Sequence, residues 1–179
     1  TSLDLPFDSP ATQHCGSCTA CIDICPTQAI VEPYMLDARK CIAYLTIEYK
    51  GIIAEELRRG IGNRVFGCDD CQLICPWNSF AKKATIDDFN PRHGLDQINL
   101  LDLWHWDEPT FLANTEGSPI RRTGYQSFMR NIAIGLGNAS FSNQIVSTLK
   151  RTRELHDEIV QVHIDWAIAE QIDKSMANT

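Results

Sequence analysis

The residues of this sequence best suited to chemistry are its eight cysteines. All of them lie between Cys15 and Cys75, and the rest of the chain contains none. A disulfide scaffold would be spread over the whole chain, and a chain of 179 residues can bury a core without disulfides. Thiols gathered in one segment of an acidic chain are typical of metal ligands. We therefore expect these cysteines to bind metal.

The first four cysteines have the spacing of bacterial-type ferredoxins. In Cys15-x2-Cys18-x2-Cys21-x3-Cys25, the first three thiolates bind one cubane cluster and the fourth reaches across to another. A proline follows directly, where it fixes φ and turns the chain away from the ligands. The pattern predicts two 4Fe-4S clusters in an electron-transfer module.

The other four cysteines complete the two ligand sets. Cys75 is followed by proline as Cys25 is, which suggests that it closes the cluster begun by the first three thiols. The first cluster is then expected to take Cys15, Cys18, Cys21 and Cys75. The second is expected to take Cys25, Cys41, Cys68 and Cys71. No cysteine is left over.

Zinc is the alternative metal. Cys18-x2-Cys21 together with Cys68-x2-Cys71 could form a tetrahedral site. Such a site would leave four thiols and both Cys-Pro pairs unexplained, so the sequence favours the clusters.

Composition excludes several classes of protein. With 44% apolar residues, 22% charged residues and a net charge of -7, the chain is typical of a soluble globular protein. No apolar run approaches the roughly 18 residues of a transmembrane helix, so we expect no membrane partner. The chain begins at Thr1 and shows no secretory signal. We expect a cytoplasmic monomer that is a piece of a longer protein.

The expected fold class is α+β, in three parts. Residues 1–14 are expected to form a linker from a preceding domain, because prolines and aspartates there show little periodicity. Residues 15–80 should form a loop-rich, ferredoxin-like module with two 4Fe-4S clusters. Residues 81–179 should form an all-α, HEAT-like helical-repeat domain, which begins at a capping box over residues 85–88.

Three helices are expected in the last part. The sequence predicts helices over residues 119–136, where Ser118 caps and Pro119 opens the first turn, and over residues 143–153. A third should precede the polar tail 175–179. Its predicted buried stripe consists of Ile159, Val162, Trp166, Ala169 and Ile172.

A weak internal similarity supports the repeat. Residues 130–136 align with residues 164–170 at an offset that suits a helical repeat such as HEAT. The alternative is chance similarity between two buried helices that carry small residues where they pack closely.

Longer motifs resemble one enzyme family. The segments 15–30, 37–48 and 62–78, followed by 116–122 and 130–133, closely resemble the epoxyqueuosine reductase family. The resemblance covers nearly the whole chain from about residue 10 onward, and it corresponds to the C-terminal half of that enzyme.

This resemblance implies an activity for the full-length oxidoreductase. Two 4Fe-4S clusters pass electrons to cobalamin, which reduces epoxyqueuosine to queuosine at the wobble position of tRNA. In the family, a preceding domain covers the cobalamin and supplies the general-acid aspartate. No catalytic residue is therefore assigned in this chain, and the portion alone is expected to be inactive. The resemblance also implies that Ala43, Cys68 and Asp69 face the corrin.

The implied partner is tRNA that carries epoxyqueuosine. No acidic residue lies between Pro119 and Arg153, and positive charges in that range suit phosphate contacts. These are Arg121, Arg122, Arg130, Lys150, Arg151 and Arg153. Lys50 and Arg64, near the cysteines, are further candidates for holding the anticodon loop. The alternative is an ordinary solvated helix face.

Other functions remain compatible with the cysteines. A reductive dehalogenase also combines cobalamin with two clusters, and a stand-alone two-cluster electron-transfer protein needs no cobalamin. The sequence has no dinucleotide-binding glycine motif, P-loop or nucleophile elbow. Both the acceptor and the electron donor protein or reductant are therefore expected to lie outside this chain.

Overall fold

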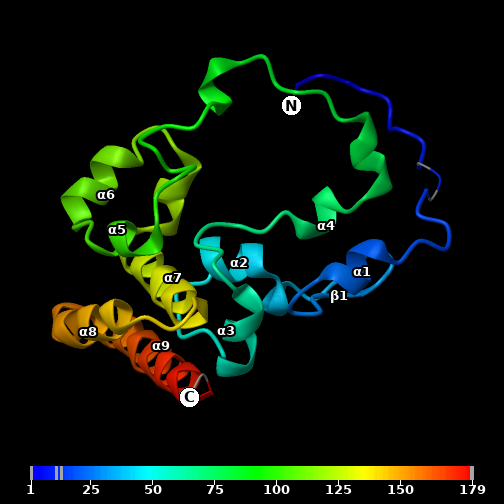
Figure 1. The fold of residues 1–179 in the computed structure, drawn as a ribbon. Coiled ribbons are helices and arrows are strands. Elements are labelled where there is room, and N and C mark those ends of the chain that lie inside the picture. The colour runs from blue at the N-terminus through cyan, green and yellow to red at the C-terminus, as the bar shows by residue number, and fades with distance from the viewer. Residues whose placement is uncertain (1, 11, 13, 178–179) are drawn as a thin grey trace.

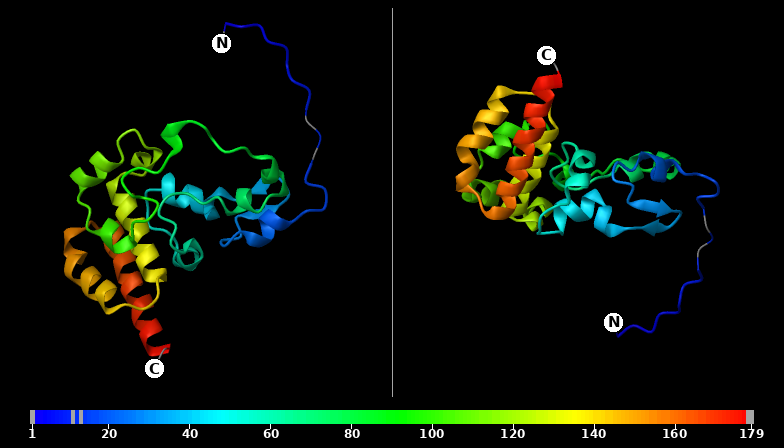
Figure 2. Two further views of the ribbon diagram at one scale, coloured as in Figure 1. Left: turned by 45° about the horizontal axis from the view of Figure 1, so that its top comes forward. Right: turned by 90° about the horizontal axis from the view of Figure 1, so that it is seen from below.

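The computed structural model describes residues 2–10, 12 and 14–177. Residues 2–10 are exposed and have no regular secondary structure. Positions 1, 11 and 13 of that linker, and positions 178 and 179 of the expected polar tail, lie outside the described residues. The cysteine region lies at one end of the molecule and a stack of helices at the other (Figure 2).

The cysteine region consists of short elements joined by loops. Its elements are α1 (Ala20–Ile24), β1 (Ile30–Glu32), β2 (Met35–Leu36), η1 (Ala38–Lys40), α2 (Ile42–Ile47), α3 (Glu55–Ile61), α4 (Asp70–Leu73) and η2 (Pro76–Phe80). The strands form one antiparallel pair, with Ile30 opposite Leu36. The longest of these elements, α3, has seven residues. The region is loop-rich, as the sequence predicts.

The remaining elements are helical. They are η3 (Asp87–Phe89), α5 (Leu100–Trp104), α6 (Glu108–Asn114), η4 (Pro119–Thr123), α7 (Tyr125–Asn138), α8 (Asn143–Thr152), η5 (Arg153–Leu155) and α9 (Glu158–Ala177). Side chains of Asn99, Asp107 and Ser118 cap the first turns of α5, α6 and η4 by accepting backbone N–H hydrogen bonds. Residues 81–99 run as a long arc from η2 to α5 (Figure 1). No helix among the described residues is long and apolar enough to cross a membrane.

Helix α7 forms the centre of the hydrophobic core. Its residues 127–137 are all buried, because α2, α3, α5, α6 and α9 pack against it. The core includes Ile42, Leu45, Ile53 and Ile61 from the cysteine region. The expected boundary near residue 80 therefore does not separate two cores, since α2 and α3 complete the helical one.

Helices α7 and α9 approach each other closely at Gly137. A Cβ atom on this residue would lie 2.6 Å from the Trp166 ring and 2.9 Å from the Ala167 Cα atom. Only glycine permits this approach without displacing the α9 backbone. The observation favours the alternative explanation of the internal similarity, in which two buried helices share small residues at a packing point.

One expected helix starts as predicted but is interrupted, and one expected helix start is wrong. The helix predicted over 119–136 is divided, because Gly124 has φ +75 and separates the 3-10 helix η4 from the α-helix α7. The capping box at residues 85–88 overlaps only the short 3-10 turn η3, and no side chain caps that turn. In both places, local capping signals are present but the backbone does not continue as one helix.

The predicted buried face of α9 is correct at Trp166 and wrong at two other positions. Ala169 and Ile172 are exposed, whereas His163 and Gln171 are fully buried. The Gln171 carboxamide donates to the carbonyls of Leu136 and Ala139, both at 2.9 Å. A hydrophobic pattern cannot reveal polar side chains that become buried because the fold supplies their hydrogen-bond partners.

His163 makes stability depend on pH. Its Nε2 atom accepts from the Ile53 backbone N–H at 3.2 Å, so Nδ1 carries the proton and donates to the Ile159 carbonyl at 2.7 Å. Burial, together with the nearby positive charges of Arg58 and Arg130, lowers the pKa of His163 to about 4. The imidazole is neutral in the folded protein at neutral pH.

We expect stability to fall as pH drops from about 6.5 toward 4, by up to about 3 kcal/mol. The sign follows because the folded pKa lies below the unfolded one, so the unfolded chain takes up the proton first. Chemical denaturation of the His163→Gln variant should show less pH dependence in this window, whereas the exposed His93→Asn control should behave like the parent. Identical pH profiles for the parent and His163→Gln would contradict the assignment.

Candidate functional site

The eight cysteines surround two cavities. A cavity of about 230 Å³ is lined by Cys15, Cys18, Cys21 and Cys75, and we call it the first cavity. A cavity of about 310 Å³ is lined by Cys25, Cys41, Cys68 and Cys71, and we call it the second cavity. The fold thus brings the thiols together in the two groups of four that the sequence suggests.

Turns and short helices shape the first cavity. The Cys18 backbone N–H donates to the Cys15 carbonyl at 3.0 Å across a turn in which Gly16 has φ +54. Cys21 lies in α1, which packs against α4, and Cys75 follows α4 directly. Because α1 and α4 are in contact, the distant Cys75 reaches the first three thiols.

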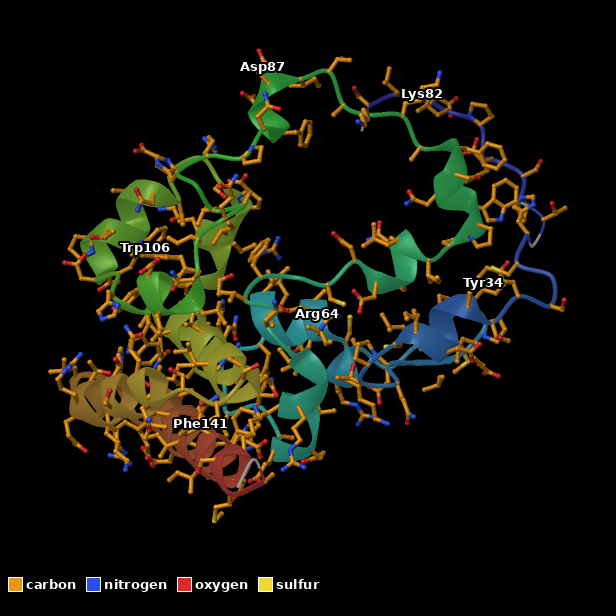
Figure 3. The ribbon with its side chains drawn as sticks, viewed as in Figure 1. Tyr34, Arg64, Lys82, Asp87, Trp106 and Phe141 are labelled. Atoms are coloured by element: carbon orange, nitrogen blue, oxygen red, sulfur yellow. The ribbon has the colours of Figure 1, made fainter. Side chains whose placement is uncertain are left out.

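Tyr34 connects this site to the β hairpin, and sequence reasoning missed it. Its hydroxyl accepts from the backbone N–H groups of His14 at 3.2 Å and Cys15 at 3.4 Å. The same residue lines the second cavity. Figure 3 shows it beside α1. No spacing rule links residue 34 to Cys15, so only the folded structure reveals the contact.

The second cavity has a largely apolar wall and a polarised thiol. Ala29, Ile30, Leu36 and Ile42 are among its lining residues. The Ala29 backbone N–H donates to the Cys25 sulfur at 3.2 Å. Burial alone would raise the pKa of Cys25, but hydrogen bonds from backbone amides outweigh it and lower the pKa overall. Amide groups aimed at sulfur favour the thiolate that metals bind.

The other thiols of this cavity lie in a less favourable environment. Burial raises the pKa of both Cys68 and Cys71; the Asp70 carboxylate raises that of Cys68 further, and the neighbouring cysteine thiols raise that of Cys71. Metal binding at these positions must therefore displace protons.

The arrangement suits a multinuclear cluster better than one ion. Among the described residues, no three His, Cys, Asp or Glu side chains are placed so that they could hold a single metal ion. Four thiols around a cavity are instead the donor set of an iron–sulfur cluster. A tetrahedral zinc site would need four ligands at about 2 Å from one point. The residues therefore fit two 4Fe-4S clusters, one at each cavity.

Apolar side chains beside the cavities are exposed. Leu73 is 70% exposed and Trp77 is 55% exposed, although each lies two residues from Cys75. His14 is also exposed, and its ring packs against Trp77 with centroids 5.6 Å apart. These side chains are therefore not part of the core in this chain.

The candidate corrin contacts adjoin the second cavity. Ala43 is half-buried in α2, two residues after Cys41. Asp69 is exposed, next to Cys68, and its carboxylate accepts from the Gln72 side chain at 3.2 Å. The structure therefore places all three predicted positions near ligands of one cavity.

Arg130 is not a surface cation, which corrects the prediction of a phosphate contact. It is 0% exposed, and its guanidinium donates to the carbonyls of Leu45, Tyr49 and Gly51 at 2.7 to 2.8 Å. Burial lowers the pKa of Arg130 to about 10, so it remains charged at neutral pH. The guanidinium of Arg130 finds its hydrogen-bond acceptors inside the protein and does not face solvent.

Several other predicted tRNA contacts have intramolecular partners. The Lys50 ammonium donates to the carbonyls of Ile47, Arg122 and Thr123. Arg153 forms ion pairs with Asp165 and Glu154, which raise its pKa.

Two further predicted contacts are also paired. Arg122 pairs with Glu48 at 2.6 Å. Arg64, labelled in Figure 3, pairs with Asp70 at 2.5 Å at the wall of the second cavity.

Three predicted contacts remain available. Arg121, Lys150 and Arg151 are exposed, and none of them forms an ion pair within the described part of the chain. Lys150 and Arg151 lie in the last turn of α8, where cations also complement the helix dipole.

Comparisons with known proteins agree with this geometry. Residues 14–78 match the family model of the 4Fe-4S double cluster binding domain. The match supports two such clusters in this chain. The chain is 57% identical over 168 residues to an epoxyqueuosine reductase of Xanthomonas campestris pv. campestris, covering 94% of this chain and 47% of the relative. It is 51% identical over 175 residues to the Escherichia coli K12 epoxyqueuosine reductase, covering 98% and 46%.

Solved structures show the same fold. The chain resembles epoxyqueuosine reductase from Bacillus subtilis with a TM-score of 0.82 and 29% identity, over 97% of this chain and 46% of that one. It also resembles an epoxyqueuosine reductase crystallised with an epoxyqueuosine-modified tRNA-Tyr stem loop, with a TM-score of 0.71 and 26% identity, over 92% and 52%. The chain is thus similar to epoxyqueuosine reductases over nearly its whole length, and it spans about half the length of the curated relatives it matches.

Proposed function

We propose that this chain is the iron–sulfur and tRNA-binding portion of an epoxyqueuosine reductase. In that enzyme it passes electrons to cobalamin for the reduction of epoxyqueuosine to queuosine in tRNA. The proposal depends chiefly on the division of eight thiols between two cavities in a chain that matches a double cluster binding domain. The names of its relatives and the tRNA stem loop in a similar structure support the substrate.

The proposed ligands follow the two cavities. Cys15, Cys18, Cys21 and Cys75 hold one cluster. Cys25, Cys41, Cys68 and Cys71 hold the other. When bound, such clusters supply one-electron transfer. Removal of an epoxide oxygen as water consumes two electrons and two protons, which a pair of one-electron carriers can match.

The proposed cobalamin position is beside the second cavity. Ala43, Cys68 and Asp69 would contact the corrin from α2 and from the start of α4. The apolar wall of this cavity would keep water from the cluster nearest the cofactor. General-acid chemistry is assigned to the part of the enzyme outside this chain.

The proposed function also implies a role for each of three segments of the chain. Residues 1–14 act as a linker, residues 15–80 hold the clusters, and residues 81–179 contact tRNA. The protein acts as a cytoplasmic monomer and receives electrons from a donor protein or reductant.

The tRNA contact surface is proposed to include the three unpaired cations. Arg121, Lys150 and Arg151 can approach phosphates without breaking an internal ion pair. Phosphate contacts release counterions, so the affinity should decrease steeply as salt rises.

The double variant Lys150→Ala with Arg151→Ala tests this surface. We expect it to bind an epoxyqueuosine-containing stem loop about tenfold more weakly, and the slope of log affinity against log salt to decrease by about two. Fluorescence anisotropy over a salt series measures both quantities. Arg59→Gln removes an exposed arginine that pairs with Glu170 and serves as the matched control. An unchanged salt slope in the double variant would exclude these residues from the interface.

A further inference from the structure

Arg130 and Asn131 form a buried polar pair in the middle of α7. Both side chains are 0% exposed. The Asn131 Oδ1 atom accepts from the Arg130 guanidinium twice, at 3.1 and 2.9 Å. Because Oδ1 faces these donors, the amide nitrogen must point the other way. The pair fixes the orientation of the Asn131 carboxamide.

The Asn131 amide group connects two segments that carry cysteines of the second cavity. Its Nδ2 atom donates to the Thr46 carbonyl and to the Val65 carbonyl, both at 2.8 Å. Thr46 belongs to α2, which begins immediately after Cys41. Val65 lies three residues before Cys68. A single side chain therefore sets the separation of these two segments.

A second hydrogen bond joins the same two segments directly. The Thr46 hydroxyl accepts from the Gly67 backbone N–H at 3.0 Å and donates to the Ile42 carbonyl at 2.7 Å. Gly67 immediately precedes Cys68, and Ile42 immediately follows Cys41. Asn131 and Thr46 together thus tie the backbone beside one thiol to the backbone beside the other.

The first cavity has no such connection to α7. Among the described residues, no α7 side chain forms a hydrogen bond with residues 14–24 or 72–80, which carry Cys15, Cys18, Cys21 and Cys75. That cavity depends instead on the contact between α1 and α4.

We propose that Asn131 is a positioning residue for the second iron–sulfur cluster. From its place in α7, the Asn131 side chain holds the segments of Cys41 and Cys68 at the spacing that the second cluster needs. The first cluster assembles without this residue. The inference depends on the ligand assignment of the proposed function.

The chain offers a matched control on the same helix. Asn138 lies two turns after Asn131, and its Nδ2 atom also donates to two carbonyls, those of Arg58 at 2.8 Å and Gly62 at 3.0 Å. These carbonyls lie at the end of α3, which carries no cysteine. Asn138→Ala therefore removes the same kind of clamp between α7 and the cysteine region without touching the segments of Cys41 and Cys68.

The experiment counts iron and acid-labile sulfide after anaerobic reconstitution. Two four-iron clusters correspond to eight iron atoms per chain in the parent. We expect Asn131→Ala to retain about half of this iron, with the electron paramagnetic resonance signal of one reduced cluster, and Asn138→Ala to retain all of it. Full iron in Asn131→Ala, or equal losses in both variants, would overturn the inference.

A second variant covers the case in which Asn131→Ala does not fold. Thr46→Val keeps the shape of the side chain but removes the acceptor for the Gly67 N–H, so the same selective loss is expected. Where Asn131→Ala does not fold, full iron in Thr46→Val would overturn the inference that the tie between these two segments sets the second cluster. If the parent itself binds no iron, the proposed function and this inference are both contradicted. If the parent, Asn131→Ala and Thr46→Val all bind eight iron atoms, only the inference is contradicted.

Discussion

Replacement of Cys41 by alanine is expected to remove one cluster and leave the other. Iron should decrease from eight atoms per chain to about four, because Cys41 lines only the second cavity. The loss should be nearly complete at that site, since a cubane cluster relies on four thiolate ligands. The first cavity keeps its four thiols and its contact between α1 and α4.

Double variants test the partition of the ligands more strictly than any single one. Cys41→Ala combined with Cys68→Ala should still leave about four iron atoms, because both residues line the second cavity. Cys41→Ala combined with Cys75→Ala should leave none, because one thiol is lost from each cavity. Iron analysis with electron paramagnetic resonance measures these outcomes. Loss of all iron in Cys41→Ala alone would show that the partition is wrong or that the two clusters assemble as one unit.

Replacement of Arg130 by alanine is expected to destabilise the fold severely. The variant would leave one buried and two partly buried carbonyls without their charged donor, remove both donors to Asn131 Oδ1, and open a cavity beside α7. Each hydrogen bond to a charged group contributes about 1.5 to 3 kcal/mol, and breaking a buried charged network costs about 3 to 5 kcal/mol. We expect a loss of at least about 4 kcal/mol in the free energy of unfolding.

Urea denaturation monitored by circular dichroism measures this loss. Arg121→Ala is the matched control, because Arg121 lies in the same basic stretch but is exposed. It should leave stability nearly unchanged and weaken tRNA binding. A stable Arg130→Ala variant with weakened tRNA binding would contradict the buried role and restore the prediction of a phosphate contact.

The cysteine chemistry could be predicted from the sequence because it depends on local spacing. Three thiols within seven residues, followed by Cys25-Pro26, suit only a few metal sites, and the match of residues 14–78 to a double cluster binding domain confirms two clusters. The loop-rich character of this region also agrees, since an apolar stretch such as residues 42–47 forms only a short helix. Spacing carries this information because the ligands themselves form the loop.

The roles of single charged and polar residues could not be predicted in the same way. Arg130 looks like its neighbours in a list of positive charges, yet it follows Phe128 and Met129 and precedes Asn131 and Ile132, which are all buried. These mostly apolar neighbours are the feature of the sequence that could have indicated the burial of Arg130. The clamp by Asn131 joins residues 46 and 65 to residue 131, and no local pattern encodes such long-range contacts.

The helical part shows the same limit. The sequence predicts α8 closely, because its amphipathic pattern is local. It does not predict that α2 and α3 enter the helical core, or that His163 and Gln171 define the buried face of α9. These features depend on which elements meet in three dimensions.

The most direct test of the proposed function is nucleoside analysis of tRNA. The gene encoding the protein that contains this chain would be disrupted in its source organism, and tRNA nucleosides would be compared by mass spectrometry with those of the intact strain. Complementation with the parent gene and with a Cys41→Ala gene completes the comparison. The proposal predicts loss of queuosine and accumulation of a species one oxygen heavier, reversed by the parent gene but not by the variant. Unchanged queuosine, in a strain with no second such gene, would contradict it.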